Sequence, residues 1–236
     1  MLSGRIQEAH GYAVIDLEAT GSSSRRHRVV ELAVVLLGPD LAPQGEFSTL
    51  IDPQGPVGPT HIHGIESSHL GGAPRFAGVA ARLLALLRGR VLVGHNVGCD
   101  RAFLVAEYGR VGLRMPAVPE LCTMRLAAAH GPAPYGLSLR ACAHALGITD
   151  WRPHTALGDA RATAGLFAHY VTHPAETGAD ATAAGADTGL AEQLRLAAEV
   201  EWPSTAGLLT GPDALWLRRS NDSALRIVSN VRNESA

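Results

Sequence analysis

The order of hydrophobic patterns along the chain constrains its fold more than any other feature. Between positions 12 and 171, apolar runs with the period-two alternation of strands are interleaved with segments of helical period. The runs with strand character are 12–18, 29–37, 47–51 and 91–94, and those with helical character are 76–87, 100–108, 137–146 and 157–170. Because strands that alternate with helices normally form a sheet covered by helices, we predict an α/β fold with a central mixed β-sheet.

The composition changes after this region, and we predict three parts. Residues 1–171 form the folded domain, and residues 190–236 form a C-terminal tail of unknown role, with helical character after position 190 and a small hairpin around positions 220–223. Residues 172–189 contain no aromatic and no large aliphatic side chain. Such a segment buries too little surface to offset its ordering entropy, so we predict a flexible linker rich in Ala, Thr and Gly.

Charge and cysteine content indicate which surfaces the chain can bind and in which compartment it works. The formal net charge is −2, so no strong basic field draws the chain to nucleic acid or to a membrane surface. Cys99, Cys122 and Cys142 are an odd number without CxxC spacing, which indicates buried thiols in a reducing compartment. No apolar run approaches the length of a membrane span, and the first residues lack an apolar signal core, so we expect a cytoplasmic protein.

Two acidic residues, Asp16 and Glu18, lie in the first apolar run, within the sequence IDLEATG. Side chains two positions apart fall on the same face of a strand, so these carboxylates should stand side by side. Like charges in that arrangement repel each other unless something screens them. Solvent, a basic side chain and a metal ion would each do so, and the pair alone does not distinguish them.

Three further residues with acid–base or ligand chemistry occur at predicted element boundaries. Asp100 follows an apolar strand in GHNVGCDRAFL, Asp159 begins a helix in RPHTALGDARAT, and His154 precedes Asp159 by five positions. Each has an ordinary structural explanation: a helix N-cap for Asp100, a favourable helix-dipole contact for Asp159, and a loop position for His154. Four carboxylates and one histidine at strand ends and helix starts nevertheless favour a shared site, because α/β folds gather their sites there.

These motifs, in this order, resemble those of the DEDDh 3′–5′ exonucleases, a group that includes the proofreading epsilon subunit of bacterial DNA polymerase III. IDLEATG is similar to the family's first motif, GHNVGCDRAFL to its second and HTALGD to its third. Supporting similarity extends to IHGIE at 62–66, LCTMRLA at 121–127 and LSLRACAHALGI at 137–148. The resemblance covers about two-thirds of the chain and leaves the tail uncovered.

The resemblance implies a ribonuclease H-like fold and hydrolysis of a terminal phosphodiester with two divalent cations, Mg²⁺ or Mn²⁺. Hard oxygen ligands suit these ions, and two cations can stabilise charge on the attacking and the leaving oxygen. In the family pattern, Asp16 would bridge both cations. Glu18 and Asp159 would complete the site of the cation that carries the nucleophilic water, and Asp100 would hold the second cation. His154 would accept the proton of that water.

The family pattern also implies which residues touch the 3′-terminal nucleotide: Thr20, Ile62, His63 and Asn96. One position departs from that pattern, because Cys99 stands where a Phe that can stack on a base is frequent. Contact with the terminal base would therefore be weaker or built differently. This departure concerns substrate affinity rather than chemistry.

The resemblance predicts an enzyme that acts on single-stranded or frayed 3′ ends of DNA and releases nucleoside 5′-monophosphates, in proofreading or repair. Two alternatives stay open: an RNA-directed 3′–5′ exoribonuclease of the same family, and a catalytically inactive module that binds nucleic acid. A DNA polymerase or sliding-clamp partner is a further hypothesis, because QLRL at 193–196 is similar to part of the bacterial clamp-binding motif. Alanines at 197 and 198 replace its aromatic anchor, so an ordinary amphipathic helix is the competing interpretation.

Overall fold

The computed structural model describes residues 10–131, 135–173, 183–205, 216–218 and 226–228. Five strands form one mixed sheet in the order β3-β2-β1-β4-β5. They are β1 (Gly11–Ala19), β2 (Val29–Leu37), β3 (Pro43–Leu50), β4 (Arg90–Gly94) and β5 (Glu120–Cys122). β2 is antiparallel to β1 and β3, whereas β4 is parallel to β1 and β5. The predicted α/β fold with a central mixed sheet is therefore confirmed.

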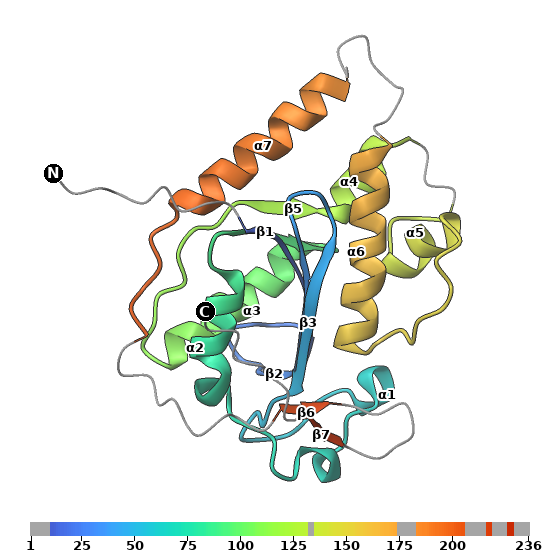
Figure 1. Ribbon diagram of the computed structural model, residues 1–236. Coiled ribbons are helices and arrows are strands. Elements are labelled where there is room, and N and C mark those ends of the chain that lie inside the picture. The colour runs from blue at the N-terminus through green and yellow to red at the C-terminus, as the bar shows by residue number, and fades with distance from the viewer. Residues whose placement is uncertain (1–9, 132–134, 174–182, 206–215, 219–225, 229–236) are drawn as a thin grey trace, which may run out of the picture.

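Helices cover both faces of this sheet. The described helices are α1 (Thr60–His63), α2 (Phe76–Leu87), α3 (Val97–Arg110), α4 (Thr123–Ala129), α5 (Leu139–Ala145), α6 (Ala156–Thr172) and α7 (Ala183–Glu199), with a 3₁₀ turn η1 (Ser67–Leu70). In Figure 1, α6 lies on one side of the sheet and α2 and α3 lie on the other.

Side-chain alternation along β1 divides the core into two layers. Ala13 and Ile15 belong to the layer that also contains the buried residues of α2 and α3. Tyr12 and Val14 point the other way and pack with α6, where Phe167 meets Tyr12 at a ring-centroid distance of 4.8 Å. Because positions 16 and 18 continue the Tyr12 series, their side chains belong to the face of the sheet covered by α6.

The helical period predicts the longer helices closely. Helix 76–87 has the predicted bounds, and its inward face buries Val79, Leu83 and Leu87. The predicted helices at 137–146 and 157–170 correspond to α5 and α6. The start of α3 differs from the prediction: the helix begins at Val97 after Asn96 (φ 67°), so Asp100 lies inside the first turn and is not the N-cap. β5 and α4 were not predicted: β5 has three residues, too few for a period to emerge, and α4 follows it directly.

The predicted linker at 172–189 overlaps helix α7, which begins at Ala183, while its flexibility stays a prediction. Residues 174–182 lie outside the described residues. Alanine has the highest helix propensity, so an Ala-rich segment without large side chains can extend a helix whose later turns are anchored. Here Leu190, Leu194 and the buried Ala197 pack in the α6-side core layer. The beginning of the predicted tail is therefore part of the folded body.

The remaining predictions concern the hairpin, the thiols and the membrane. Strands β6 (Trp216–Arg218) and β7 (Arg226–Val228) pair antiparallel as the predicted hairpin, whose turn lies outside the described residues. All three cysteines are free, and Cys122 and Cys142 are buried as predicted. Cys99 is exposed instead, because the inward face of α3 is formed by other positions, among them Val97. No helix among the described residues is long and apolar enough to cross a membrane.

Candidate active site

The two acidic residues of β1 lie where the pairing of this strand changes. β1 pairs with β2 over most of its length, but the register with the parallel strand β4 covers only Gly11 to Val14. The last part of β1 therefore has an open edge on the β4 side, at the carboxyl ends of two parallel strands. Ligand sites of α/β sheets occupy this position. Asp16 and Glu18 both belong to this part of the strand.

Asp100 approaches this edge from α3. Asn96 adopts the left-handed conformation directly after β4, which turns the chain into the helix and places Asp100 in its first turn. Burial raises the pKa of Asp100 to about 7, while interactions with the backbone of Asp100 itself and of Leu17 act to lower it.

Asp159 approaches the same region from the first turn of α6, and it is 9% exposed. The His154 amide donates to Asp159 Oδ2 at 3.0 Å, and the Trp151 indole Nε1 donates to Oδ1 at 2.8 Å. His154 adopts a left-handed conformation (φ 59°) that directs its amide back to the helix. Burial raises the pKa of Asp159, while the hydrogen bonds from Trp151 and His154 oppose the shift.

These side chains converge on one cluster. Ligand atoms of Glu18, His154 and Asp159 all lie within 4.8 Å of one another. The pKa of Asp16 is raised well above its usual value, first by burial and then by the negative charges of four carboxylates, those of Asp100, Asp159, Glu18 and Glu31. The structure thus brings together the five residues predicted to carry the chemistry, although their catalytic roles stay predictions.

The donor set of this cluster fits a hard divalent cation. Its ligands are carboxylate oxygens and one imidazole, a combination suited to Mg²⁺ or Mn²⁺. A bound cation would relieve the mutual repulsion that raises the pKa of Asp16. The side chains that would hold it are those of Asp16, Glu18, Asp100 and Asp159.

Glu31 is a member of the cluster that the sequence pattern does not indicate. It lies in β2 directly opposite Glu18, and it is 3% exposed. Its Oε2 accepts a hydrogen bond from the Ala156 amide at 3.1 Å, so the carboxylate caps the first turn of α6. The partial positive charge at a helix N-terminus favours a carboxylate there. In the apolar run VVELAVVLL, a single acid gives no sign of this partner, which appears only with the strand register.

Two of the residues predicted to contact a nucleotide are open to solvent. Ile62 in α1 is 47% exposed, which is unusual for a large aliphatic side chain and is compatible with a contact surface. Asn96 is exposed, and its Nδ2 donates to Cys99 Sγ at 3.1 Å. Their contact with a nucleotide stays a prediction.

Thr20 and His63, the other two residues predicted to contact a nucleotide, have hydrogen-bond partners within the protein. The Thr20 hydroxyl oxygen accepts from the Arg28 amide at 3.0 Å, and Gly58 packs so closely that a Cβ there would lie 2.3 Å from the Thr20 carbonyl oxygen. His63 is 2% exposed, and its Nδ1 accepts from the Ile65 amide at 3.0 Å. The His63 ring is therefore a structural part of the turn after α1, and its predicted nucleotide contact is untested.

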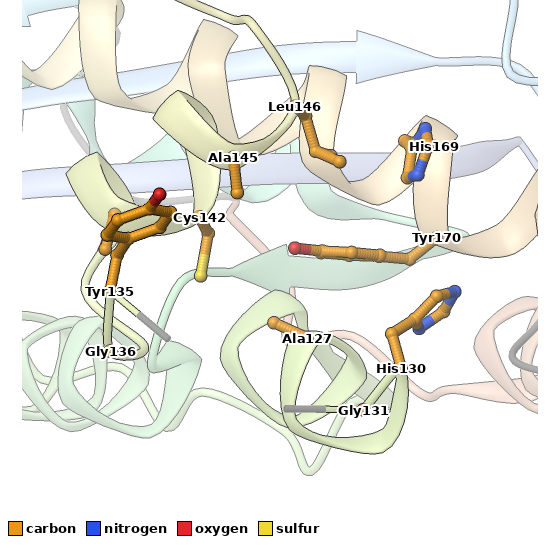
Figure 2. Close-up of a pocket in the computed structure, with 11 residues that line it drawn as sticks. Ala127, His130, Gly131, Tyr135, Gly136, Cys142, Ala145, Leu146, His169 and Tyr170 are labelled. Atoms are coloured by element: carbon orange, nitrogen blue, oxygen red, sulfur yellow. The ribbon is translucent and has the colours of Figure 1, made fainter. Parts of the chain in front are cut away.

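A cavity of about 200 Å³ lies elsewhere, between α4, α5 and the C-terminal half of α6. Figure 2 shows Cys142 and Tyr170 directed toward each other across it, with His130 and His169 near Tyr170. Asp159 lies in the first turn of α6, at the opposite end of that helix. None of the predicted site residues lines this cavity.

A mixed sheet with four carboxylates and a histidine gathered at the end of its central strand suits a metal-dependent hydrolase of the α/β class. Consistent with this class, the exonuclease family model named for RNase T matches residues 13–167. The chain therefore belongs to the DEDDh exonuclease family, whose members are hydrolytic nucleases that use divalent metal ions. The family resemblance drawn from the three motifs is confirmed.

Similar curated proteins include bacterial proteins named for the epsilon subunit of DNA polymerase III. The chain is 36% identical over 162 residues to a DNA polymerase III subunit epsilon-like protein of Rhodobacter capsulatus, with 66% of this chain and 23% of the relative covered. It is 33% identical over 159 residues to the DNA polymerase III subunit epsilon of Aquifex aeolicus, with 66% of this chain and 78% of the relative covered. The chain thus spans about a quarter of the Rhodobacter relative's length.

Solved structures confirm the predicted ribonuclease H-like fold. The nuclease domain of 3′hExo, a DEDDh family member bound to rAMP, superposes with a TM-score of 0.59 at 20% identity, covering 70% of this chain and 93% of that domain. E. coli Exonuclease I in complex with a dT13 oligonucleotide superposes with a TM-score of 0.57 at 18% identity, covering 66% of this chain and 40% of the other.

Proposed function

We propose that this chain is a metal-dependent 3′–5′ exonuclease that hydrolyses the terminal phosphodiester of DNA and releases nucleoside 5′-monophosphates. The observation that carries the proposal is the cluster itself. Asp16, Glu18, Asp100 and Asp159 reach one point from three different elements, and His154 lies at its exposed border. Several carboxylates this close together repel one another unless a cation binds between them, which supports a metal-dependent enzyme over a catalytically inactive module.

The four carboxylates would hold two divalent cations, Mg²⁺ or Mn²⁺. When bound, these cations would neutralise charge on the phosphate and lower the pKa of a water molecule. The carboxylates of Asp16 and Asp100 carry raised pKa values, so the cluster is prepared to exchange protons for cations near neutral pH.

His154 would act on the water. Its ring would accept the water proton as the oxygen attacks phosphorus, and the bond from phosphorus to the 3′ oxygen of the preceding nucleotide would break. The strand that ends in that nucleotide would leave as a 3′-oxyanion, which takes a proton from solvent to become a 3′-hydroxyl, and the terminal nucleotide would be released as a 5′-monophosphate. His154 is exposed, and its backbone is held by the hydrogen bond to Asp159, so the ring would be both oriented and accessible.

DNA is the proposed substrate, with proofreading or repair as the role. Two relatives that carry the name of DNA polymerase III subunit epsilon, at 36% and 33% identity, support this choice. A solved 3′-exonuclease of the same fold, at 18% identity, recognises a histone mRNA stem-loop, so RNA is the competing substrate class. The 2′-hydroxyl distinguishes the two classes.

The structure of segment 193–196 is less favourable for the proposed polymerase or sliding-clamp partner. The segment 193–196 is helical in α7, and its Leu194 packs in the α6-side core layer rather than lying extended. A partner at this segment would need another surface of the helix.

A nuclease panel tests the proposal. Single-stranded, mismatched-primer and duplex DNA and a matching RNA, each with a 5′ label, are incubated with Mg²⁺, Mn²⁺ or EDTA. We expect single-nucleotide shortening from the 3′ end, no reaction in EDTA, and faster loss of DNA than of RNA. The Asp16→Asn variant controls for contaminating nucleases. Rapid cutting of a covalently closed single-stranded circle would contradict an exonuclease, and faster loss of RNA would favour the exoribonuclease.

A further inference from the structure

Trp151 makes a contact in the cluster that the family motifs do not predict. Its indole N–H donates to Asp159 Oδ1 at 2.8 Å, while the His154 amide donates to Oδ2 at 3.0 Å. A carboxylate with a donor on each oxygen is held in one rotational position. Asp159 is 9% exposed, so solvent contributes little to its orientation. The carboxylate so fixed lies in the same group of ligand atoms as Glu18 and His154.

The start of α6 leaves room for the loop that carries Trp151. A Cβ at Gly158 would lie 3.4 Å from Trp151 Cδ1, 2.6 Å from the Arg152 carbonyl oxygen and 2.5 Å from the Thr155 hydroxyl oxygen. The Thr155 hydroxyl donates to the same Arg152 carbonyl at 2.8 Å, which closes the loop before the helix. Glycine at position 158 therefore lets this loop lie against the first turn of α6, with the indole at contact distance.

We propose that Trp151 is a positioning residue for cation binding, which holds the Asp159 carboxylate in the orientation that the cluster requires. The inference rests on the proposed function, because this orientation matters only if Asp159 is a cation ligand. Trp151 itself cannot be a ligand, since an indole N–H is only a donor. Residues that hydrogen-bond to metal ligands typically change metal affinity by ~10–100-fold when replaced.

The first test is the Trp151→Phe variant, which removes the indole N–H and keeps an aromatic ring. We expect the Mn²⁺ affinity measured by isothermal titration calorimetry, without substrate, to fall ~10–100-fold. The Mn²⁺ concentration for half-maximal hydrolysis should rise by the same factor, while the rate at saturating Mn²⁺ stays close to that of the wild type. A residue that matters only for packing would instead lower the melting temperature and leave the Mn²⁺ affinity of the folded fraction unchanged.

The second test uses the wild-type protein and requires no turnover. The chain has three tryptophans, so the Trp151 indole resonance in ¹⁵N spectra can be assigned by replacing each of the other two in turn. Adding Mg²⁺ to the cation-free protein should shift this indole resonance. Trp202 is the matched control: its Nε1 is buried without a hydrogen-bond partner among the described residues, and its ring packs in the α2–α3 core layer.

Trp202→Phe also removes an indole N–H, and it should leave the Mn²⁺ affinity unchanged. An unchanged affinity in Trp151→Phe, or a Trp151 indole resonance that does not respond to Mg²⁺ in a protein that binds it, would overturn the inference and leave the proposed function in place. A wild-type protein that binds no divalent cation would overturn both.

Discussion

Oε2 of Glu31 accepts a hydrogen bond from the Ala156 amide at 3.1 Å, although 125 positions separate the two residues. The bond joins the strand beside β1 to the first residue of α6, the helix that carries Asp159. It therefore connects two of the elements on which the acidic cluster is built, and it places a fifth carboxylate next to the predicted four.

Replacing Glu31 should separate its structural role from its charge. Glu31→Ala leaves the buried Ala156 amide without its acceptor, which should reduce the free energy of unfolding by about 1–3 kcal/mol. Glu31→Gln keeps an acceptor oxygen and removes the same negative charge near Asp16, so it should be at least as stable as the wild type. Urea unfolding without cations measures both. A Glu31→Ala variant as stable as Glu31→Gln would show that this bond contributes nothing.

Asp16→Asn should abolish hydrolysis and stabilise the cation-free protein. Asp16 is the residue on which burial and the repulsion of four carboxylates act together, and the neutral amide removes that repulsion. We expect a higher melting temperature in EDTA at pH 8 and a much smaller increase on adding Mg²⁺. Glu201→Gln, at an exposed acid, serves as the control and should change neither property. Substantial hydrolysis by Asp16→Asn would contradict its assignment as a cation ligand.

The stability of the cation-free protein should fall as pH rises from about 4 to about 7. The pKa of Asp100 is raised from its ordinary value of 3.8 to about 7, so in this interval the folded state binds more protons than the unfolded state. The free energy of unfolding then decreases with pH and levels off above the folded-state pKa. Asp16, with its raised pKa, contributes in the same direction.

Melting temperatures in EDTA, measured for the wild type and for Asp100→Asn, test this dependence. The comparison with the variant is needed because burial lowers the pKa of His95, which acts in the opposite direction. We expect the difference between the two proteins to grow with pH over this interval and Mg²⁺ to reverse it. A difference that is independent of pH would mean that Asp100 titrates normally.

His154→Ala should reduce the single-turnover rate by about 10²–10⁴-fold, the usual loss for a positioned general base. An acid limb in the rate would not identify this base, because Asp100 has a pKa of about 7. The measurement is therefore made at saturating Mn²⁺ and pH 8, above the pKa of Asp100. His61→Ala, at another exposed histidine, is the control. A rate close to the wild type would make His154 an ordinary loop residue.

Glu107→Ala should be strongly destabilising, with little change in rate per folded molecule. Glu107 is 1% exposed and pairs with Arg28 through two hydrogen bonds of 2.8 and 3.0 Å, while the Val29 amide donates to it as well. Removing one partner of a buried ion pair costs about 3–5 kcal/mol, and we expect the lower end because the Arg28 side chain is 25% exposed. Glu107→Gln should cost less. Urea unfolding and the single-turnover rate together test both parts of this prediction.

The sequence by itself determined the local elements and the chemically active residues. The helix at 76–87 has its predicted bounds because a helical period depends only on residues three or four positions apart. Asp16 and Glu18 share a face for the same local reason, and the spacing of His154 and Asp159 places both at one helix start. These features depend on residues a few positions apart, so the order of amino acids is sufficient to predict them.

Only the tertiary structure decided which residues support that cluster. Glu31 meets Ala156 because the register sets β2 against the end of β1, and Trp151 meets Asp159 because His154 turns the loop back in a left-handed conformation. β5 is a strand because β4 pairs with it, and α7 is anchored because its leucines dock on the sheet. These contacts join segments that are far apart in sequence and are brought together only by folding. A local sequence pattern therefore cannot predict them.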